Sequence, residues 1–143
     1  MIRIKVKKTN EDAIIPTYSK KGDAGMDLYS IKDYYIPARR VRLIETGLKV
    51  EIPEGYEGQI RPRSGLALNH GITVLNTPGT IDSGYRGEIG VILINHGIDS
   101  YNIKKGDKIA QIIFIKHETA NLEEVTELSE TERGIGSFGH TGK

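Results

Sequence analysis

The chain has 143 residues, 20 basic and 19 acidic side chains, a net charge of +1 and no cysteine. This length suits one domain, the balanced charge gives no general attraction to nucleic acid or membranes, and the lack of cysteine excludes disulfides and thiolate metal sites. Because no apolar run approaches the length of a signal or membrane-spanning segment, we expect a cytoplasmic protein with no nucleic-acid or membrane partner.

The composition favours strands, because 21 isoleucines stand against nine aromatic residues and β-branched side chains suit pleated sheets. Residues 1–7 alternate apolar and basic side chains and predict an edge strand, whereas residues 8–23 read as irregular. Ala24 to Tyr29 predicts a short strand with Asp27 in its middle; this acid is either simply outward-facing or functional. Further strands are expected within 34–52 and at 56–61, 88–95, 101–103 and 108–115.

One short helix is predicted between Arg61 and Gly71, under three turns long, with Ser64 as its N-cap and Gly71 as its C-terminal stop. Arg63, followed by a serine and a glycine, would bring a guanidinium, a hydroxyl and free backbone N–H groups to one point, which suits a phosphate. The alternative is an ordinary capped helix beside a solvated arginine.

A glycine-rich segment from Asn76 to Gly90 separates two apolar runs and predicts a hairpin that carries polar groups. The pairs Pro78-Gly79 and Ser83-Gly84 are typical of turns, for which glycine supplies positive φ. Its exposed backbone could pair with a flat, hydrogen-bonding ring. Asp82 could then hold or deprotonate a water, or it could be only a turn-forming Asx residue. Tyr85 offers either an aromatic face to a ligand or a half-buried strand side chain.

Two other features suggest a ligand. Gln111 interrupts an apolar strand, where an unpaired amide costs about 1–3 kcal/mol, so the core or, as we favour, a ligand satisfies it. The glycine-rich end, Arg133 to Lys143, would by default be disordered, but it holds an arginine, a phenylalanine and a Thr-Gly pair that could grip phosphates and stack on a base. We therefore expect a flap that orders over ligand. The four histidines show no metal-ligand spacing.

Together, these segments resemble the five ordered motifs of the trimeric dUTPase family. The matching segments are residues 24–28, 63–65, 76–90, 106–111 and 133–142, in order and with fitting gaps. The resemblance implies an all-β, distorted jelly-roll or β-clip-like barrel with one short helix and a mobile C-terminal arm. It also implies a single domain over 1–143, with a core of about 1–128 and a flap of 129–143.

The activity implied by the resemblance is Mg²⁺-dependent hydrolysis of dUTP to dUMP and pyrophosphate by a homotrimer with its sites at subunit interfaces. Asp82 resembles the carboxylate that holds the water for attack on the α-phosphorus. Tyr85 resembles the tyrosine under the deoxyribose that excludes a 2′-hydroxyl. The positions that match uracil-reading groups are Asn76, Thr80, Ile81 and Gly90.

The remaining matches concern the triphosphate. Gln111 matches a contact to the phosphates and the attacking water, and Asp27 an acid that supports the metal's water shell; Mg²⁺ itself is expected on phosphates and water, with no direct protein ligand. Phe138 would stack on uracil, worth about 1–3 kcal/mol. The other substrate-binding matches are Arg63, Ser64, Gly65, Arg133, Gly139, His140 and Thr141.

Small departures from the family pattern occur in the flap, where His140 stands in place of a more common serine and Ser137 in place of a glycine.

Two alternatives compete with the dUTPase assignment. A dCTP deaminase relative would need a glutamate that activates water at the base, whereas the hairpin offers Asp82 near the phosphates. A nucleic-acid-binding β-barrel would carry a basic groove with aromatic residues on its strands, which the balanced charge does not favour.

Overall fold

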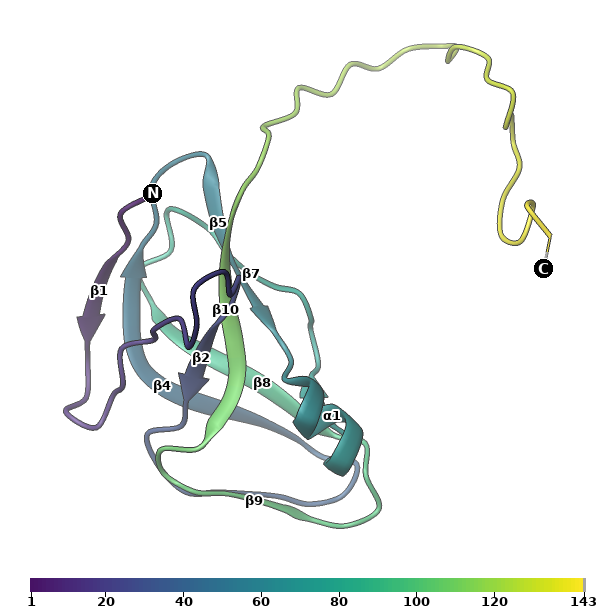
Figure 1. The fold of residues 1–143 in the computed structure, drawn as a ribbon. Helices are drawn as coiled ribbons and strands as arrows, with labels where there is room; N and C mark the ends of the chain where they lie inside the picture. Colours follow the sequence, from purple (N-terminus) through teal and green to yellow (C-terminus); the bar gives the residue numbers. More distant parts are fainter. Residues whose placement is uncertain (143) are drawn as a thin grey trace.

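Two four-stranded antiparallel sheets face each other in this computed structural model, which describes residues 1–142 (Figure 1). One sheet has the order β1-β4-β8-β6 and the other β2-β10-β5-β7, while β3 and β9 form a separate ribbon. The strands are β1 (Lys5–Lys8), β2 (Met26–Tyr29), β3 (Tyr34–Ile36), β4 (Val41–Glu51), β5 (Tyr56–Arg61), β6 (Ile72–Val74), β7 (Gly79–Ile81), β8 (Glu88–Asn95), β9 (Tyr101–Ile103) and β10 (Lys108–Lys116). The predicted jelly-roll-like β fold is confirmed.

The core between the sheets is aliphatic, as the composition predicted. In β8 the side chains of Ile89, Val91, Leu93 and Asn95 alternate inward and are buried. Asn95 is accommodated because its amide donates to the carbonyls of Ile36 and Asp99 at 3.1 and 2.8 Å. Strand alternation therefore determines which face of β8 is buried. At the last residue of β8, the buried Asn95 amide is hydrogen-bonded through both its nitrogen and its oxygen.

The predicted short helix, α1 (Ser64–His70), is confirmed, together with its stop at Gly71, whose φ is +66°. The predicted N-cap is wrong. Arg63 occupies the cap position in extended conformation, no side chain caps the helix, and Ser64 is its first helical residue. The Ser64 hydroxyl is therefore not used as a backbone cap.

The glycine-rich segment connects β6 to β8, which pair as predicted with Val74 opposite Leu93. The short strand β7 lies between them in the sequence and was not predicted. It belongs to the other sheet, where it pairs with β5 and Gly79 stands opposite Ile60. The hairpin therefore bridges the open edge between the two sheets. That position creates the pocket described below.

Residues 117–142 contain no strand and lead away from the β structure (Figure 1). The last backbone hydrogen bond that ties this segment to the β structure runs from His117 N–H to Gly55 O, in the turn between β4 and β5, at 3.0 Å. Nearly every later residue is exposed, including Phe138 at 105%. Within the described residues, no helix has the length and apolar character needed to cross a membrane.

Candidate active site

A pocket of about 160 Å³ opens between β7 and β8. Apolar side chains form part of its wall, and the backbone of the glycine-rich segment forms much of the rest. This volume suits one six-membered ring, since an engineered cavity of about 150 Å³ holds benzene. Six predicted site residues line it together: Asn76, Thr80, Ile81, Asp82, Tyr85 and Gly90.

The glycines of this segment serve a different purpose from the one predicted. The chain does turn at Ser83-Gly84, where Tyr85 N–H donates to the Asp82 carbonyl, whereas Gly79 lies in β7. Neither glycine has positive φ, so the reason predicted for a glycine at these positions is wrong. Gly79 instead allows close approach, because a Cβ there would lie 3.2 Å from the Asn76 side-chain nitrogen. The peptide between Thr77 and Pro78 is cis.

Tyr85 is fixed by its hydroxyl, which donates to the Glu88 carbonyl oxygen at 2.9 Å. Its ring crosses Gly87 so closely that a Cβ at Gly87 would lie 2.3 Å from the tyrosine oxygen. The side chain remains 44% exposed, leaving it accessible to a ligand. Tyr85 is thus a held but open aromatic surface at the pocket mouth, not a half-buried strand residue.

Asp82 is exposed at the rim of the pocket. Its backbone carbonyl accepts from Tyr85 N–H at 3.1 Å, but within residues 1–142 its carboxylate accepts no hydrogen bond and makes no ion pair. The Asx-turn alternative therefore has no support here. The turn forms through the backbone, which leaves both carboxylate oxygens available to a water.

A second group of predicted residues lies elsewhere, around Asp27. The Asp27 carboxylate forms ion pairs with Arg63 Nε at 3.2 Å and with Lys108 Nζ at 2.8 Å. The hydrogen bond to Asp27 raises the pKa of Lys108 above its usual range. One acid and two cations make this cluster net positive, which suits an anionic ligand.

Gln111 stands opposite both Asp27 and Arg61 in the sheet. Its amide nitrogen donates to the Pro62 carbonyl at 3.0 Å, so part of its hydrogen-bonding capacity is met by the protein itself. Its oxygen lies against Gly25, where a Cβ would approach within 2.3 Å. The glycine therefore makes room for this amide at the edge of the cluster.

The two groups occupy separate surfaces of one chain. A shallow depression beside Asp27 includes Gly25, Arg61 and Gln111 and shares no lining residue with the pocket that holds Asp82. Ser64 and Gly65 lie exposed on the first turn of α1, directly after Arg63. The structure thus gathers the predicted base-reading residues at one place and the predicted phosphate-binding residues at another.

The predicted flap residues reach neither group. Arg133 donates through Nε to the Gly136 carbonyl at 3.0 Å, and the His140 ring contacts the Ser137 carbonyl at 3.1 Å. Phe138, Gly139 and Thr141 are exposed on the same extended segment. In a single chain, this segment contributes nothing to either surface.

Several residues of these surfaces were missed by the sequence reading. Lys108 was predicted as the start of a strand and lies in the matching segment 106–111, but no binding role was assigned to it. Glu88 lines the pocket and supplies the carbonyl that holds Tyr85, but nothing in the local pattern distinguished it. The apolar wall residues that were not predicted are Ile60, Ile89 and Ile92.

For a metal ion, the described residues offer no group of three or more histidine, cysteine or acidic side chains that could hold one. Asp27 is the only predicted metal-supporting acid, and each of its carboxylate oxygens already forms an ion pair. A Mg²⁺ ion here would therefore need oxygen ligands from a bound anion and from water, which is a common arrangement for this ion.

Comparisons with known proteins agree on one family. The dUTPase family model matches residues 11–142. A deoxyuridine 5′-triphosphate nucleotidohydrolase from Clostridioides difficile is 58% identical over 99% of both chains, and one from Nautilia profundicola is 58% identical over 99% of this chain and 100% of its own.

Solved structures give the same result. The Staphylococcus bacteriophage 80alpha dUTPase with dUPNHPP matches with a TM-score of 0.93 at 29% identity, over 100% of both chains. A mutant dUTPase from phage phi11 of S. aureus, described as revealing the coordination of a structural Mg(II) ion, matches with a TM-score of 0.84 at 27% identity, over 90% of this chain and 100% of its own.

Proposed function

The chain belongs to the dUTPase family, and on that premise we propose that it hydrolyses dUTP to dUMP and pyrophosphate. This reaction limits uracil incorporation into DNA and supplies dUMP for dTMP synthesis. The observation that carries the proposal is the ring-sized pocket with an unpaired carboxylate at its rim and an accessible tyrosine at its mouth.

Selection of the base and of the sugar both follow from the hairpin. Asn76 and the backbone of Thr80, Ile81 and Gly90 would pair with the polar edge of uracil, and the small pocket would leave no room for a 5-methyl group. Tyr85 would lie under the deoxyribose and clash with a 2′-hydroxyl. Such discrimination is strong when buried polar groups of the site lose their partners with the wrong substrate.

The chemical step requires a positioned water. Asp82 would accept a proton from this water as its oxygen attacks the α-phosphorus, while the bond from that phosphorus to the β-phosphate bridging oxygen breaks and pyrophosphate leaves. Gln111 would help to orient the water and the phosphates. General-base assistance of this kind contributes about 10²- to 10⁴-fold to a rate.

The triphosphate would be held by Arg63, Ser64 and Gly65 of a neighbouring subunit. Support comes from the separation of the two surfaces, since a single chain does not bring the Asp82 pocket and the Asp27 cluster together. A homotrimer would join one chain's pocket to another chain's cluster at each interface. Lys108, beside Arg63, would add positive charge to this phosphate site.

The C-terminal segment would complete the site from a further subunit. Arg133, Gly139, His140 and Thr141 would contact the γ-phosphate and Phe138 would stack on uracil. The extended course of residues 117–142, away from their own sheets, supports a flap that reaches another chain (Figure 1). On this view the chain is one domain, with a core of about 1–128 and a flap of 129–143.

Magnesium would be bound by the substrate phosphates and by water, with Asp27 contacting it through water. Because Asp27 already forms ion pairs with Arg63 and Lys108, it would have to share or exchange one of these contacts when substrate arrives. When bound, the ion would neutralise charge that develops on the pyrophosphate leaving group.

A substrate panel tests the proposal directly. The protein is incubated with dUTP, dTTP, dCTP or UTP in the presence of Mg²⁺, and pyrophosphate and ammonia are measured. We expect pyrophosphate from dUTP and little from the others. Equal rates on all four nucleotides would contradict the selectivity assigned to the hairpin, and ammonia released from dCTP would point to a deaminase.

A further inference from the structure

The start of β8, which forms one wall of the pocket, faces an irregular stretch of β4. Glu45 pairs with Gly90 and Lys49 with Glu88, so three residues of β4, Thr46 to Leu48, face Ile89 alone. Such a bulge interrupts the regular ladder of backbone hydrogen bonds. Other contacts must therefore fix the backbone of β8 where it lines the pocket.

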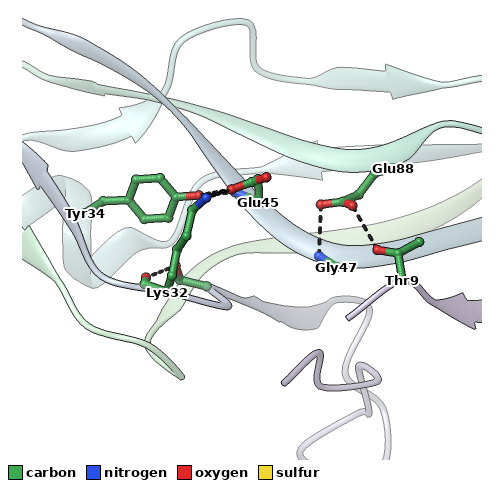
Figure 2. A network of polar contacts seen from close by, with 7 residues as sticks. Thr9, Lys32, Tyr34, Glu45, Gly47 and Glu88 are labelled. Atoms are coloured by element: carbon green, nitrogen blue, oxygen red, sulfur yellow. Dashed lines mark hydrogen bonds and ion pairs between the residues drawn. The ribbon is translucent and has the colours of Figure 1, made fainter. Parts of the chain in front are cut away.

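Side chains supply these contacts. The Thr46 hydroxyl donates to the Ile89 carbonyl at 2.6 Å. The Glu88 carboxylate accepts from Gly47 N–H at 3.2 Å through one oxygen and from the Thr9 hydroxyl at 2.9 Å through the other (Figure 2). Each oxygen of one carboxylate thus binds a different segment of the chain.

These contacts form a closed ring. Thr9 N–H donates to the Gly47 carbonyl at 2.8 Å, so Thr9, Gly47 and Glu88 are each joined to the other two. Gly47 has a φ of +66°, and a Cβ there would lie 2.9 Å from the Ala13 Cβ. The bulge therefore packs closely against the N-terminal segment. A shift of the bulge would break the hydrogen bonds that join Thr9, Gly47 and Glu88.

The same residue connects this ring to the sugar-binding surface. The carbonyl oxygen of Glu88 accepts from the Tyr85 hydroxyl, while its side chain is held by Gly47 and Thr9. Tyr85 itself is 44% exposed, so its hydrogen bond to the Glu88 carbonyl contributes to the position of the aromatic ring in addition to its packing on Gly87. Its position depends on where the Glu88 carbonyl stands.

We infer that Glu88 is a positioning residue for sugar selection: through its carboxylate, the ring of Thr9, Gly47 and Glu88 holds the carbonyl that anchors Tyr85. Glu88 contacts neither the reacting phosphorus nor the water in this scheme. Its loss should affect discrimination between deoxyribose and ribose more than the chemical step. The inference rests on the proposed dUTP hydrolysis.

The test compares kcat and KM for dUTP and UTP in the full-length protein and its variants. Glu88→Ala removes both acceptors, and we expect the ratio of kcat/KM for dUTP over UTP to fall roughly three- to tenfold, as for the loss of one well-formed hydrogen bond. KM for dUTP should rise more than kcat falls. Glu88→Gln keeps an acceptor for Gly47 and a partner for the Thr9 hydroxyl, so it should restore most of the ratio.

A matched control separates positioning from general stabilisation. Glu51 forms an ion pair with Lys5 at 2.7 Å and so also joins the N-terminal strand to β4, but within residues 1–142 no hydrogen bond or ion pair links it to Glu88. Glu51→Ala should leave the ratio unchanged. If Glu88→Ala lowers thermal stability yet keeps the wild-type ratio, the carboxylate is only structural and the inference is wrong.

A double-mutant cycle identifies the route of the effect. Tyr85→Phe removes the hydroxyl that reaches the Glu88 carbonyl. In that background, Glu88→Ala should change the ratio much less than in the wild type, whereas additive effects would overturn the inference. A wild-type protein inactive on dUTP would instead refute the proposed function, an outcome distinct from an active enzyme with an unchanged ratio.

Discussion

The backbone of Gly87 lies directly under the side chain of Tyr85, leaving no room for a Cβ. An added Cβ would stand 2.3 Å from the tyrosine oxygen and 2.5 Å from the ring carbon that bears it. Because the Tyr85 side chain is 44% exposed, its aromatic ring could move away from an added Cβ into solvent. The glycine therefore sets how low the aromatic surface lies over the mouth of the pocket.

Gly87→Ala should displace the Tyr85 ring and break its hydrogen bond to Glu88. We expect the ratio of kcat/KM for dUTP over UTP to fall by about tenfold, because the ring no longer blocks the 2′ position. Steady-state kinetics on both nucleotides measure this. Gly84→Ala is the control, since a Cβ at Gly84 meets nothing within 4 Å and its φ is not positive. Equal losses in both variants would contradict the role of Gly87.

Asp82→Asn keeps the shape of the side chain but removes its ability to take a proton. We expect kcat on dUTP to fall by about 10²- to 10⁴-fold while dUTP binding remains close to that of the wild type. Stopped-flow or steady-state assays give kcat, and calorimetry with a non-hydrolysable analogue gives binding. Asp99→Asn alters an exposed aspartate outside the pocket and should have no effect. Full activity of Asp82→Asn would remove this residue from the mechanism.

Local sequence patterns predicted the regular strands well. The bounds of β8 and β9 match the expected 88–95 and 101–103, because alternating apolar residues and flanking turn residues define them. In contrast, β7 has only three residues and carries no periodicity. Its pairing with β5 depends on the packing of the two sheets, so no local signal could have placed it.

Within the matched segments, the candidate site was predictable only for residues to which the family resemblance gives a role. The residues of the hairpin gather in one pocket, whereas the importance of Glu88 depends on contacts with Thr9 and Gly47, which are 79 and 41 positions away in the sequence. Likewise, the pairing of Lys108 with Asp27 follows from β10 lying beside β2. Such long-range contacts arise from strand order, which periodicity does not determine.

The ionisation of Glu45 makes the free energy of unfolding depend on pH in the acid range. Hydrogen bonds from Lys32 and then Tyr34 lower the pKa of the Glu45 carboxyl (Figure 2). A lowered pKa stabilises the folded state above the ordinary glutamate value of about 4.3, and this contribution disappears as pH falls through the folded-state pKa. Glu45→Gln should therefore be less stable than the wild type at pH 6, with a smaller difference at pH 3.5.

Urea unfolding at fixed protein concentration measures this difference, which solvent exposure of the pair should keep small. The raised pKa of Lys32 contributes nothing to the acid change, because its effect would be lost only at alkaline pH. Glu54→Gln, at an exposed position with no ion pair in residues 1–142, serves as the control. A difference that stays constant between the two pH values would contradict the assignment.

Sharing of one site between chains can be tested by mixing two inactive proteins. Deletion of 133–143 removes the flap but leaves Asp82, whereas Asp82→Asn keeps the flap. If each site combines Asp82 of one chain with the flap of another, mixed trimers contain some complete sites, and activity should return to a substantial fraction of the wild-type value. Denaturing and refolding the two proteins together, followed by a dUTP assay, measures the recovery.

The same experiment has two internal checks. Each protein refolded alone should be nearly inactive. Each should also be a trimer by light scattering, which for the deletion would show that the core still folds. As a second check, the double variant that carries both Asp82→Asn and Phe138→Ala is mixed with the single variant Asp82→Asn. This mixture should recover no activity, because no chain then supplies the carboxylate. The mixture of the 133–143 deletion with Asp82→Asn could also stay inactive although mixed trimers form. Each chain would then use its own flap, because a site built from the Asp82 and the flap of one chain is defective in both proteins.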